Sequence, residues 1–200
     1  MSGAGSNQPR LDRRQAIRVL LAKRGDVLVV TGLGSTTYDA ASVADDERNF
    51  YLWGAMGAAA MVGLGLAIAR PERRVLVVTG DGEMLMGMGA LATIGLQRPE
   101  NLAIVVFDNG HYGETGMQAS HTGHGIDLAA IAGASGFVTA VTLRTLDEIA
   151  AIAPSLNQEA AGPRLYVIKV AADSPPRSMP ARDAVLIKNR FRAHLGLAPN

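Results

Sequence analysis

The segment VLVVTGDG at residues 75–82 runs from five apolar or β-branched residues straight into two glycines that flank a carboxylate. A short apolar run without polar alternation is typical of a strand that is buried on both faces, as in a parallel sheet. Further runs of this kind occur at residues 27–31, 102–107 and 165–170, with a weaker one at 137–141. These segments predict the strands of a parallel sheet.

Helical segments separate the predicted strands. They cover residues 10–24, 52–69, 84–97, 126–132, 146–157 and 181–195. Gly25 is expected to end the first helix. Thr145 and Glu148 form a capping box at the start of the fifth, and Pro154 is expected to kink or split it. This alternation predicts a doubly wound α/β fold with helices on both faces of the sheet, and such folds bind ligands at the carboxyl ends of the strands.

Composition limits the class of protein. The chain has 200 residues, of which 48% are hydrophobic and 18% charged, and a net charge of +1. These values predict one domain over residues 10–200 that follows a flexible tail at residues 1–9. The absence of cysteine excludes zinc ribbons, iron–sulfur clusters and thiol nucleophiles on this chain. No Lys/Arg run is present, which argues against nucleic-acid binding.

Two segments bear on the location of the protein. Residues 50–69 carry no charge and are long enough to span a bilayer, but they consist largely of Gly and Ala. We therefore expect a helix that is buried on all sides rather than a membrane span. The N-terminal residues lack the continuous apolar run of an export signal, so we expect a cytoplasmic protein.

Polar residues that follow two of the predicted strands indicate a metal–phosphate site. Gly80-Asp81-Gly82 follows a strand and opens a helix, where free N–H groups favour a phosphate. Asp81 would repel a bare diphosphate, but it is well suited to hold a divalent cation that bridges to phosphate oxygens. Asn109 follows the next strand and would add an amide oxygen. For Gly-Asp-Gly alone, a tight turn with a helix cap is the alternative interpretation.

At these residues the chain resembles the thiamine-diphosphate-dependent 2-oxo acid decarboxylases, specifically their diphosphate-binding domain. The resemblance implies that Mg²⁺ is held by Asp81, Asn109 and the backbone carbonyl of His111. The segments 87–94 and 112–118 resemble more closely the β subunit of sulfopyruvate decarboxylases and the C-terminal half of phosphonopyruvate decarboxylases. The similarity extends over roughly residues 27 to 170.

The resemblance also implies how the cofactor is held. Residues 52–57 resemble the segment that supports the cofactor's pyrimidine ring, so Met56 is expected under the bent cofactor. The carbonyl of Gly54 is expected to accept a hydrogen bond from the 4′-amino group. Further cofactor contacts are expected from Gly34, Ser35, Gly80, Gly82, Glu83, Tyr112, Gly113 and Glu114.

Two positions depart from the family pattern. Glu83 stands where a Ser or Thr hydroxyl often bonds the diphosphate. We therefore expect the backbone N–H of Glu83 to bond the diphosphate instead, while the carboxylate is turned away or screened by the metal. Asp108 precedes Asn109 where many members have two Asn residues, although Asp is usual in the subgroup that the chain resembles.

The family's activity requires a glutamate from a separate pyrimidine-binding domain, for which a chain of this length has no room. We therefore expect a partner chain of similar size that supplies this glutamate, in a hetero-oligomer with at least two copies of each chain. Alone, this chain is expected to bind cofactor weakly and to turn nothing over.

The predicted reaction is decarboxylation of a sulfopyruvate- or phosphonopyruvate-like 2-oxo acid to an aldehyde and CO₂. A carboligase subunit resembling acetolactate synthase and a non-catalytic cofactor-binding or regulatory relative remain alternatives. A related oxidoreductase subunit is disfavoured, because no cysteine is present to ligate an iron–sulfur centre.

Other candidate residues receive simpler interpretations. His121 and His124 are expected to be solvated residues of a mobile lid rather than metal ligands, because no third ligand is evident. Gly32-Leu33-Gly34 is not a dinucleotide motif, because Thr37 stands where the third glycine would fall. Core filling is expected of Met84, Met86 and Met88.

Overall fold

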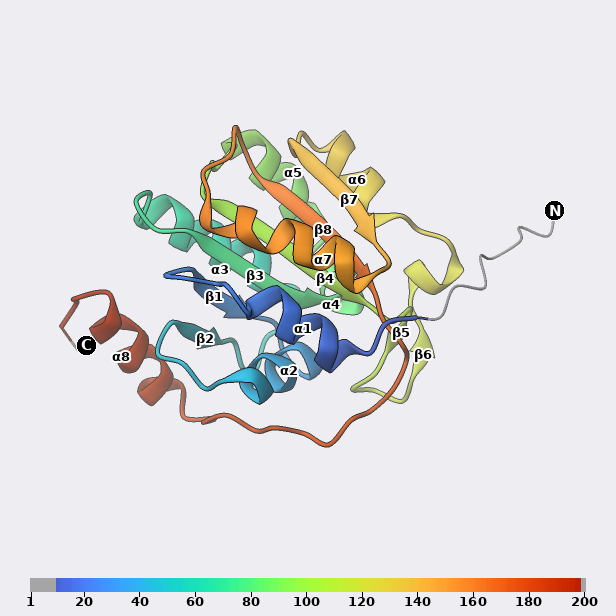
Figure 1. Ribbon diagram of the computed structural model, residues 1–200, viewed down its shortest axis with the longest axis horizontal. Helices are drawn as coiled ribbons and strands as arrows, with labels where there is room; N and C mark the ends of the chain where they lie inside the picture. Colours follow the sequence, from blue (N-terminus) through green and yellow to red (C-terminus); the bar gives the residue numbers. More distant parts are fainter. Residues whose placement is uncertain (1–9, 199–200) are drawn as a thin grey trace.

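The computed structural model describes residues 10–198, so the tail predicted at residues 1–9 lies outside the described part. Its main sheet has six parallel strands in the order β2-β1-β3-β4-β8-β7 (Figure 1). The strands are β1 (Leu28–Thr31), β2 (Asn49–Tyr51), β3 (Val75–Gly80), β4 (Leu102–Asp108), β7 (Thr139–Leu143) and β8 (Arg164–Lys169). A separate antiparallel pair is formed by β5 (His111–Tyr112) and β6 (Gln118–Ala119). The predicted doubly wound parallel sheet is confirmed.

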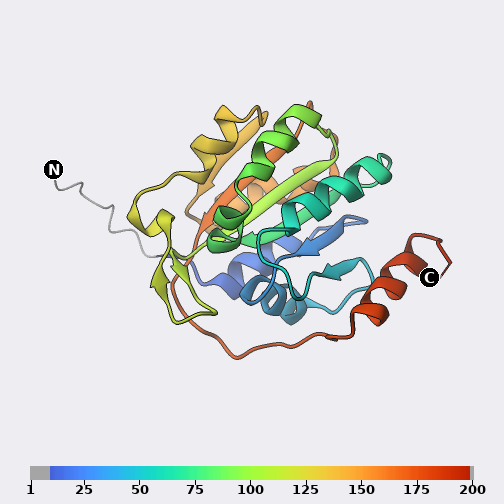
Figure 2. The ribbon, with the colours of Figure 1, turned by 180° about the vertical axis from the view of Figure 1, so that it is seen from behind.

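Helices cover both faces of this sheet (Figures 1 and 2). The α-helices are α1 (Arg13–Leu21), α2 (Ser35–Val43), α3 (Ala59–Ala69), α4 (Asp81–Met86), α5 (Gly89–Gln97), α6 (Leu128–Ala134), α7 (Leu146–Ile152) and α8 (Ala184–His194). Two short 3₁₀ helices are η1 (His121–His124) and η2 (Ala153–Asn157). One apolar core joins the sheet to α3, α4, α5 and α6, and the other joins it to α1, α2, α7 and η2.

The apolar runs become strands because both of their faces are buried. In β3, Val75 and Val77 belong to the core under α3 and α5, whereas Leu76 and Val78 belong to the core under α1 and α7. Successive side chains point to opposite faces of a sheet, so only an uninterrupted apolar run fills both cores. This explains why the four strongest apolar runs were placed correctly to within one residue at each end.

The region around residues 50–69 differs from the prediction of one helix over 52–69. Residues 49–51 form the edge strand β2, residues 52–58 form a loop, and α3 begins only at Ala59. Gly54 and Gly57 have φ angles of 79° and 83°, in the left-handed region that interrupts a helix. The loop therefore exists because of the same glycines that made the segment rich in small residues.

Helix α3 is also not buried on all sides. Ala60, Leu64 and Ala67 face the core, whereas Met61 and Ile68 are exposed. Among the described residues, no helix combines the length and the apolar character that crossing a bilayer would require.

The helix predicted over 84–97 is two helices, α4 and α5, with a break at Gly87 and Met88. At Gly87 the chain meets the 52–58 loop so closely that a Cβ would lie 2.1 Å from the carbonyl oxygen of Gly57. The helix predicted over 10–24 is shorter, because α1 ends at Leu21, before Gly25. The helix predicted over 126–132 is shifted to 128–134 by the N-cap Asp127.

The remaining differences are small. The weak strand predicted at 137–141 is β7 at residues 139–143, and α2 was not predicted. The predicted capping box of Thr145 and Glu148 is present. The segment predicted as one kinked helix over 146–157 is split at Pro154 into α7 and η2, and α8 lies within the predicted 181–195.

Residues 171–183, called here the C-terminal strap, have no regular secondary structure. The strap passes along α2 and leads to α8 beside the edge strand β2 (Figure 1). It accepts a hydrogen bond from Arg14 at the Pro176 carbonyl (2.7 Å) and another from the Trp53 indole at the Ala181 carbonyl (3.1 Å). The strap therefore connects α1 with the 52–58 loop.

Candidate functional site

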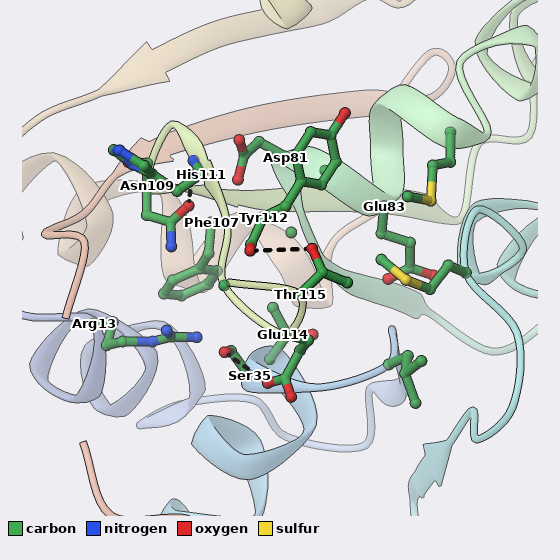
Figure 3. A pocket seen from close by; sticks show the side chains of 17 residues that line it. Arg13, Ser35, Asp81, Glu83, Phe107, Asn109, His111, Tyr112, Glu114 and Thr115 are labelled. Carbon is green, nitrogen blue, oxygen red and sulfur yellow. Dashed lines mark hydrogen bonds between the residues drawn. The ribbon is translucent and has the colours of Figure 1, made fainter. Parts of the chain in front are cut away.

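A cavity lies at the carboxyl ends of β1, β3 and β4 (Figure 3). The pairing of β3 with β4 places Gly80 opposite Phe107, so the loops after these strands meet. Of the predicted site residues, the cavity is lined by Ser35, Met56, Gly80, Asp81, Gly82, Glu83, Asn109, His111, Tyr112, Gly113 and Glu114. Gly34 and Gly54 are not among the lining residues. Gly34 directly precedes α2, and Gly54 is exposed in the 52–58 loop.

Asp81 begins α4 and is buried at the top of the cavity in Figure 3. Its Oδ2 accepts hydrogen bonds from the hydroxyls of Ser120 and Thr122, the latter at 3.0 Å. Burial raises the pKa of Asp81, because an ionised carboxylate loses hydration there. No cation of the described residues pairs with this carboxylate, so a bound divalent cation would compensate its charge.

The neighbouring residues Asp108 and Asn109 have different roles. Asp108 points away from the cavity and is paired with Lys169, and it accepts hydrogen bonds from Gly110 N (2.9 Å) and Thr122 Oγ1 (2.7 Å). Asn109 lines the cavity, and its Oδ1 accepts the His111 N–H at 2.8 Å. Asp108 therefore has a structural function here, and Asn109 is the member of the pair that faces the cavity.

The described histidines do not form a metal site together with other protein side chains. Within residues 10–198, no group of three or more His, Asp or Glu side chains is arranged to hold a metal ion. His121 lies with its Nδ1 3.3 Å from the Tyr112 hydroxyl, and His124 ends the short helix η1. A cation at Asp81 would therefore depend on amide and backbone oxygens, together with oxygens from a ligand.

The Glu83 carboxylate turns toward the 52–58 loop, as expected from its replacement of a hydroxyl residue. Its Oε2 accepts a hydrogen bond from Thr79 Oγ1 at 2.8 Å, and Oε1 accepts one from the Ala59 N–H at 3.4 Å. Burial raises the pKa of Glu83. The side chain is therefore occupied with protein groups, and only its backbone N–H is left for a ligand.

Two methionines line the cavity, and a third lies close to one of them in the sequence. Met56 and Met86 line it, and Met86 is 56% exposed, while the nearby Met88 is 41% exposed. The prediction of core filling is therefore confirmed for Met84, which is buried, and is wrong for Met86 and Met88. These three exposed residues, Met56, Met86 and Met88, are called here the methionine rim.

Several lining residues were missed by the sequence analysis. They are Arg13, Leu33, Thr36, Met86, Phe107 and Thr115. Arg13 comes from α1, far from the glycine-rich loops, and only its position directly after the N-cap Asp12 was available as a signal. Glu114, which was predicted, is held by Ser35 Oγ at 3.4 Å and by Arg177 at 3.2 Å (Figure 3 draws the first of these).

The region that matches known proteins is the one that contains the cavity loops. Residues 32–170 match the model of the family described as thiamine pyrophosphate enzyme, C-terminal TPP binding domain. This range contains the loops after β1, β3 and β4, and it excludes α1 and α8.

The chain is also similar to curated proteins. It is 43% identical to sulfopyruvate decarboxylase subunit beta of Methanocaldococcus jannaschii over 121 residues, which are 60% of this chain and 63% of that protein. Its identity to the same subunit of Methanothermobacter thermautotrophicus is 43%, covering 64% of this chain and 68% of that one. It is 36% identical to phosphonopyruvate decarboxylase of Streptomyces viridochromogenes, covering 98% of this chain and 49% of that protein. The chain thus spans about half to two thirds of the length of these relatives.

Solved structures share the fold. A putative thiamin diphosphate-dependent enzyme from Mycobacterium smegmatis has a TM-score of 0.68 at 24% identity, covering 80% of this chain and 32% of that one. Benzoylformate decarboxylase from Polynucleobacter necessarius has a TM-score of 0.69 at 20% identity, covering 88% of this chain and 36% of that one. At these identities the likeness concerns the fold. Together, the family model and the curated relatives show that this chain belongs to the thiamine pyrophosphate enzymes and carries their C-terminal cofactor-binding domain.

Proposed function

We propose that this chain is one subunit of a cytoplasmic, two-chain decarboxylase that uses thiamine diphosphate and Mg²⁺ and acts on a 2-oxo acid of the sulfopyruvate or phosphonopyruvate type. The observation that carries the proposal is the meeting of Asp81, Asn109 and Met56, from three separate segments of the chain, around one cavity. The relatives named above include decarboxylases of these two 2-oxo acids, which supports the substrate class.

The residues of the cavity fit a magnesium-bound diphosphate. At Gly80 a Cβ would meet no atom within 4 Å, so the turn before α4 leaves room for a ligand. The first N–H groups of a helix have no partner within the helix and can donate to phosphate oxygens. Asp81, Asn109 and the carbonyl of His111 would hold Mg²⁺, and backbone N–H groups of Glu83 and Glu114 would reach the diphosphate.

Thiamine diphosphate supplies a nucleophilic carbon and an electron sink for the loss of CO₂. The protein supplies orientation, and effective orientation is worth roughly 7–11 kcal/mol of an activation barrier where it is complete. Met56 would support the bent cofactor from the 52–58 loop, and the Gly54 carbonyl of the same loop would orient the 4′-amino group. Glu83 accepts a hydrogen bond from the N–H of Ala59, the residue that follows this loop.

A partner chain is needed to complete this site. Of the described residues, the glutamates that line the cavity are Glu83 and Glu114, and both are engaged by neighbours of this chain. Neither is therefore available to bond the pyrimidine ring of the cofactor. We propose that the partner chain supplies this glutamate, in an assembly with at least two copies of each chain.

The exposed apolar surface of two neighbouring helices is suited to such a partner. Helices α3 and α5 lie side by side on the face of the sheet seen in Figure 2. Their outer surfaces expose Met61 and Ile68 on α3 and Leu96 on α5, and this surface is called here the α3–α5 face. Large exposed apolar areas are typical of protein interfaces. We propose that the α3–α5 face and the methionine rim are covered by the partner.

Leu96→Glu tests this surface. Leu96 is 80% exposed, so the substitution is expected to change the free energy of unfolding by less than about 0.5 kcal/mol. A charge placed in an apolar interface should weaken partner binding roughly tenfold or more, which is about 1.4 kcal/mol. Analytical ultracentrifugation or calorimetric titration of the two chains measures this affinity. Val185→Glu on α8, where Val185 is 60% exposed, is the matched control, and equal weakening by both variants would contradict the assignment.

The proposed function is tested by copurifying the chain with its partner from the native source and assaying release of CO₂. Sulfopyruvate, phosphonopyruvate and pyruvate are supplied with thiamine diphosphate and Mg²⁺. We expect CO₂ release that requires both chains and both cofactors. Turnover by this chain alone would contradict the shared site. Condensation with a second carbonyl compound would identify a carboligase, and cofactor binding without turnover would identify a non-catalytic relative.

A further inference from the structure

Arg13 is a buried cation that reaches the cavity from outside the matched region. It is the first residue of α1, its exposed fraction is 4%, and it precedes the family match at residues 32–170. In Figure 3 its side chain extends from α1 toward the cavity, on the side of Ser35 and Phe107. A charged side chain at such a position requires compensation, since burial removes its hydration.

The described residues supply only part of the negative charge that Arg13 requires. Arg13 Nε donates to Asp39 Oδ2 at 2.7 Å, and Arg14 Nε donates to Oδ1 of the same carboxylate at 2.6 Å. Two guanidinium groups thus share one buried carboxylate, which leaves these three side chains with an excess of positive charge. In the described part of the chain, the two terminal nitrogens of Arg13 have no hydrogen-bond partner. Their four N–H donors are therefore available to a ligand.

The position of Arg13 in the cavity indicates which end of the proposed cofactor it would contact. It lines the cavity together with Ser35, Asn109 and Glu114, and these four residues also border a second, adjoining pocket. Met56 lines the first cavity but not the adjoining pocket. Arg13 therefore lies with the loops assigned to the diphosphate and not with the residue assigned to the rings of the cofactor.

We propose that Arg13 binds the terminal phosphate of thiamine diphosphate. This inference rests on the proposed function of the cavity. A guanidinium presents its N–H donors in a planar fork that matches two oxygens of a phosphate. A fully ionised diphosphate group carries more negative charge than one Mg²⁺ ion neutralises, and the guanidinium of Arg13 would offset part of the remainder. The carboxylate of Glu114, which borders the same wall, is paired with Arg177 at 3.2 Å.

The test compares Arg13→Gln with Arg14→Gln. Both variants remove one partner of Asp39, but Arg14 does not line the main cavity, so it controls for the loss of that ion pair. Isothermal titration of the complex of both chains, in Mg²⁺, measures the affinity for thiamine diphosphate, thiamine monophosphate and thiamine. We expect Arg13→Gln to weaken thiamine diphosphate binding 10- to 100-fold, and to weaken thiamine binding less than threefold. Arg14→Gln is expected to change each affinity less than threefold.

Arg13→Lys keeps the positive charge but lacks the planar fork of N–H donors, so it should cause an intermediate loss of thiamine diphosphate affinity. This variant also tests the inference if Arg13→Gln does not fold. Unchanged thiamine diphosphate affinity in both Arg13 variants would overturn the inference, as would an equal loss for all three ligands. A rise confined to the KM of the 2-oxo acid would also overturn it and would place Arg13 at the substrate. If the unmodified complex binds no thiamine diphosphate, the proposed function fails as well, which distinguishes the two failures.

Discussion

Asp81→Asn is expected to lower the affinity of the assembled protein for thiamine diphosphate in Mg²⁺ by about 100-fold or more, and to abolish turnover. Even residues that only orient metal ligands change metal affinity by about 10- to 100-fold, and Asp81 is a carboxylate of the cavity that pairs with no cation of the described residues. The amide that replaces it keeps the shape of the side chain but lacks the charge that attracts Mg²⁺. Titration calorimetry with and without Mg²⁺ measures the effect.

The same substitution is expected to stabilise the metal-free chain. Burial raises the pKa of Asp81, so its ionised form is disfavoured in the folded chain without a cation. The thermal midpoint in a chelator should therefore rise for Asp81→Asn. Asp127→Asn is the control, because Asp127 caps α6 away from the main cavity and Asn is an equally good cap. A loss of stability together with full Mg²⁺-dependent binding would refute the assigned role.

Gly95→Ala is expected to destabilise the fold by about 2–3 kcal/mol. Gly95 lies in α5 where the helix contacts the turn after α6, and a Cβ there would lie 1.6 Å from the carbonyl oxygen of Ser135. Backbone atoms cannot yield as a flexible side chain can, so the two helices must move apart. In a chain of this size each 1 kcal/mol corresponds to about 2–4 °C in Tm.

Gly65→Ala is the matched control for this effect. Gly65 also lies within a helix, and a Cβ there would meet nothing within 4 Å. The exchange should stabilise the chain by about 0.5–1 kcal/mol, because alanine loses less conformational freedom in a helix. Thermal and urea denaturation of both variants measure the difference, and similar Tm values for the two would show that the contact at Gly95 is loose.

The central strands and their loops could be predicted because one local pattern encodes each of them. Val75 to Thr79 forms a strand for reasons present in its own residues, and Asp81 follows where the strand must end. Strand β2 has no such signal. Its three residues are extended because they pair with β1. Tertiary contacts of this kind are invisible in a single segment.

Helix α2 and residue Arg13 show the same limit in other ways. The α2 sequence STTYDAASV contains few strong helix formers, and two of its threonines donate hydrogen bonds to the Gly32 carbonyl. Its helical state depends on burial against α1, β3 and β1. Arg13 was missed because a helix start does not reveal which side chain of the first turn points inward. Met86 and Met88 were misplaced because apolar character indicates burial without saying whether this chain or a partner provides it.

The C-terminal strap suggests how the chain tolerates change. Its bonds to Arg14 and Trp53 are accepted by the main-chain oxygens of Pro176 and Ala181. Any amino acid offers the same oxygen, so substitutions at those two positions are compatible with both bonds. The spacing between the two oxygens is not adjustable in this way. Among homologues, the residue types at positions 176 and 181 should therefore vary freely, while insertions and deletions between them stay rare.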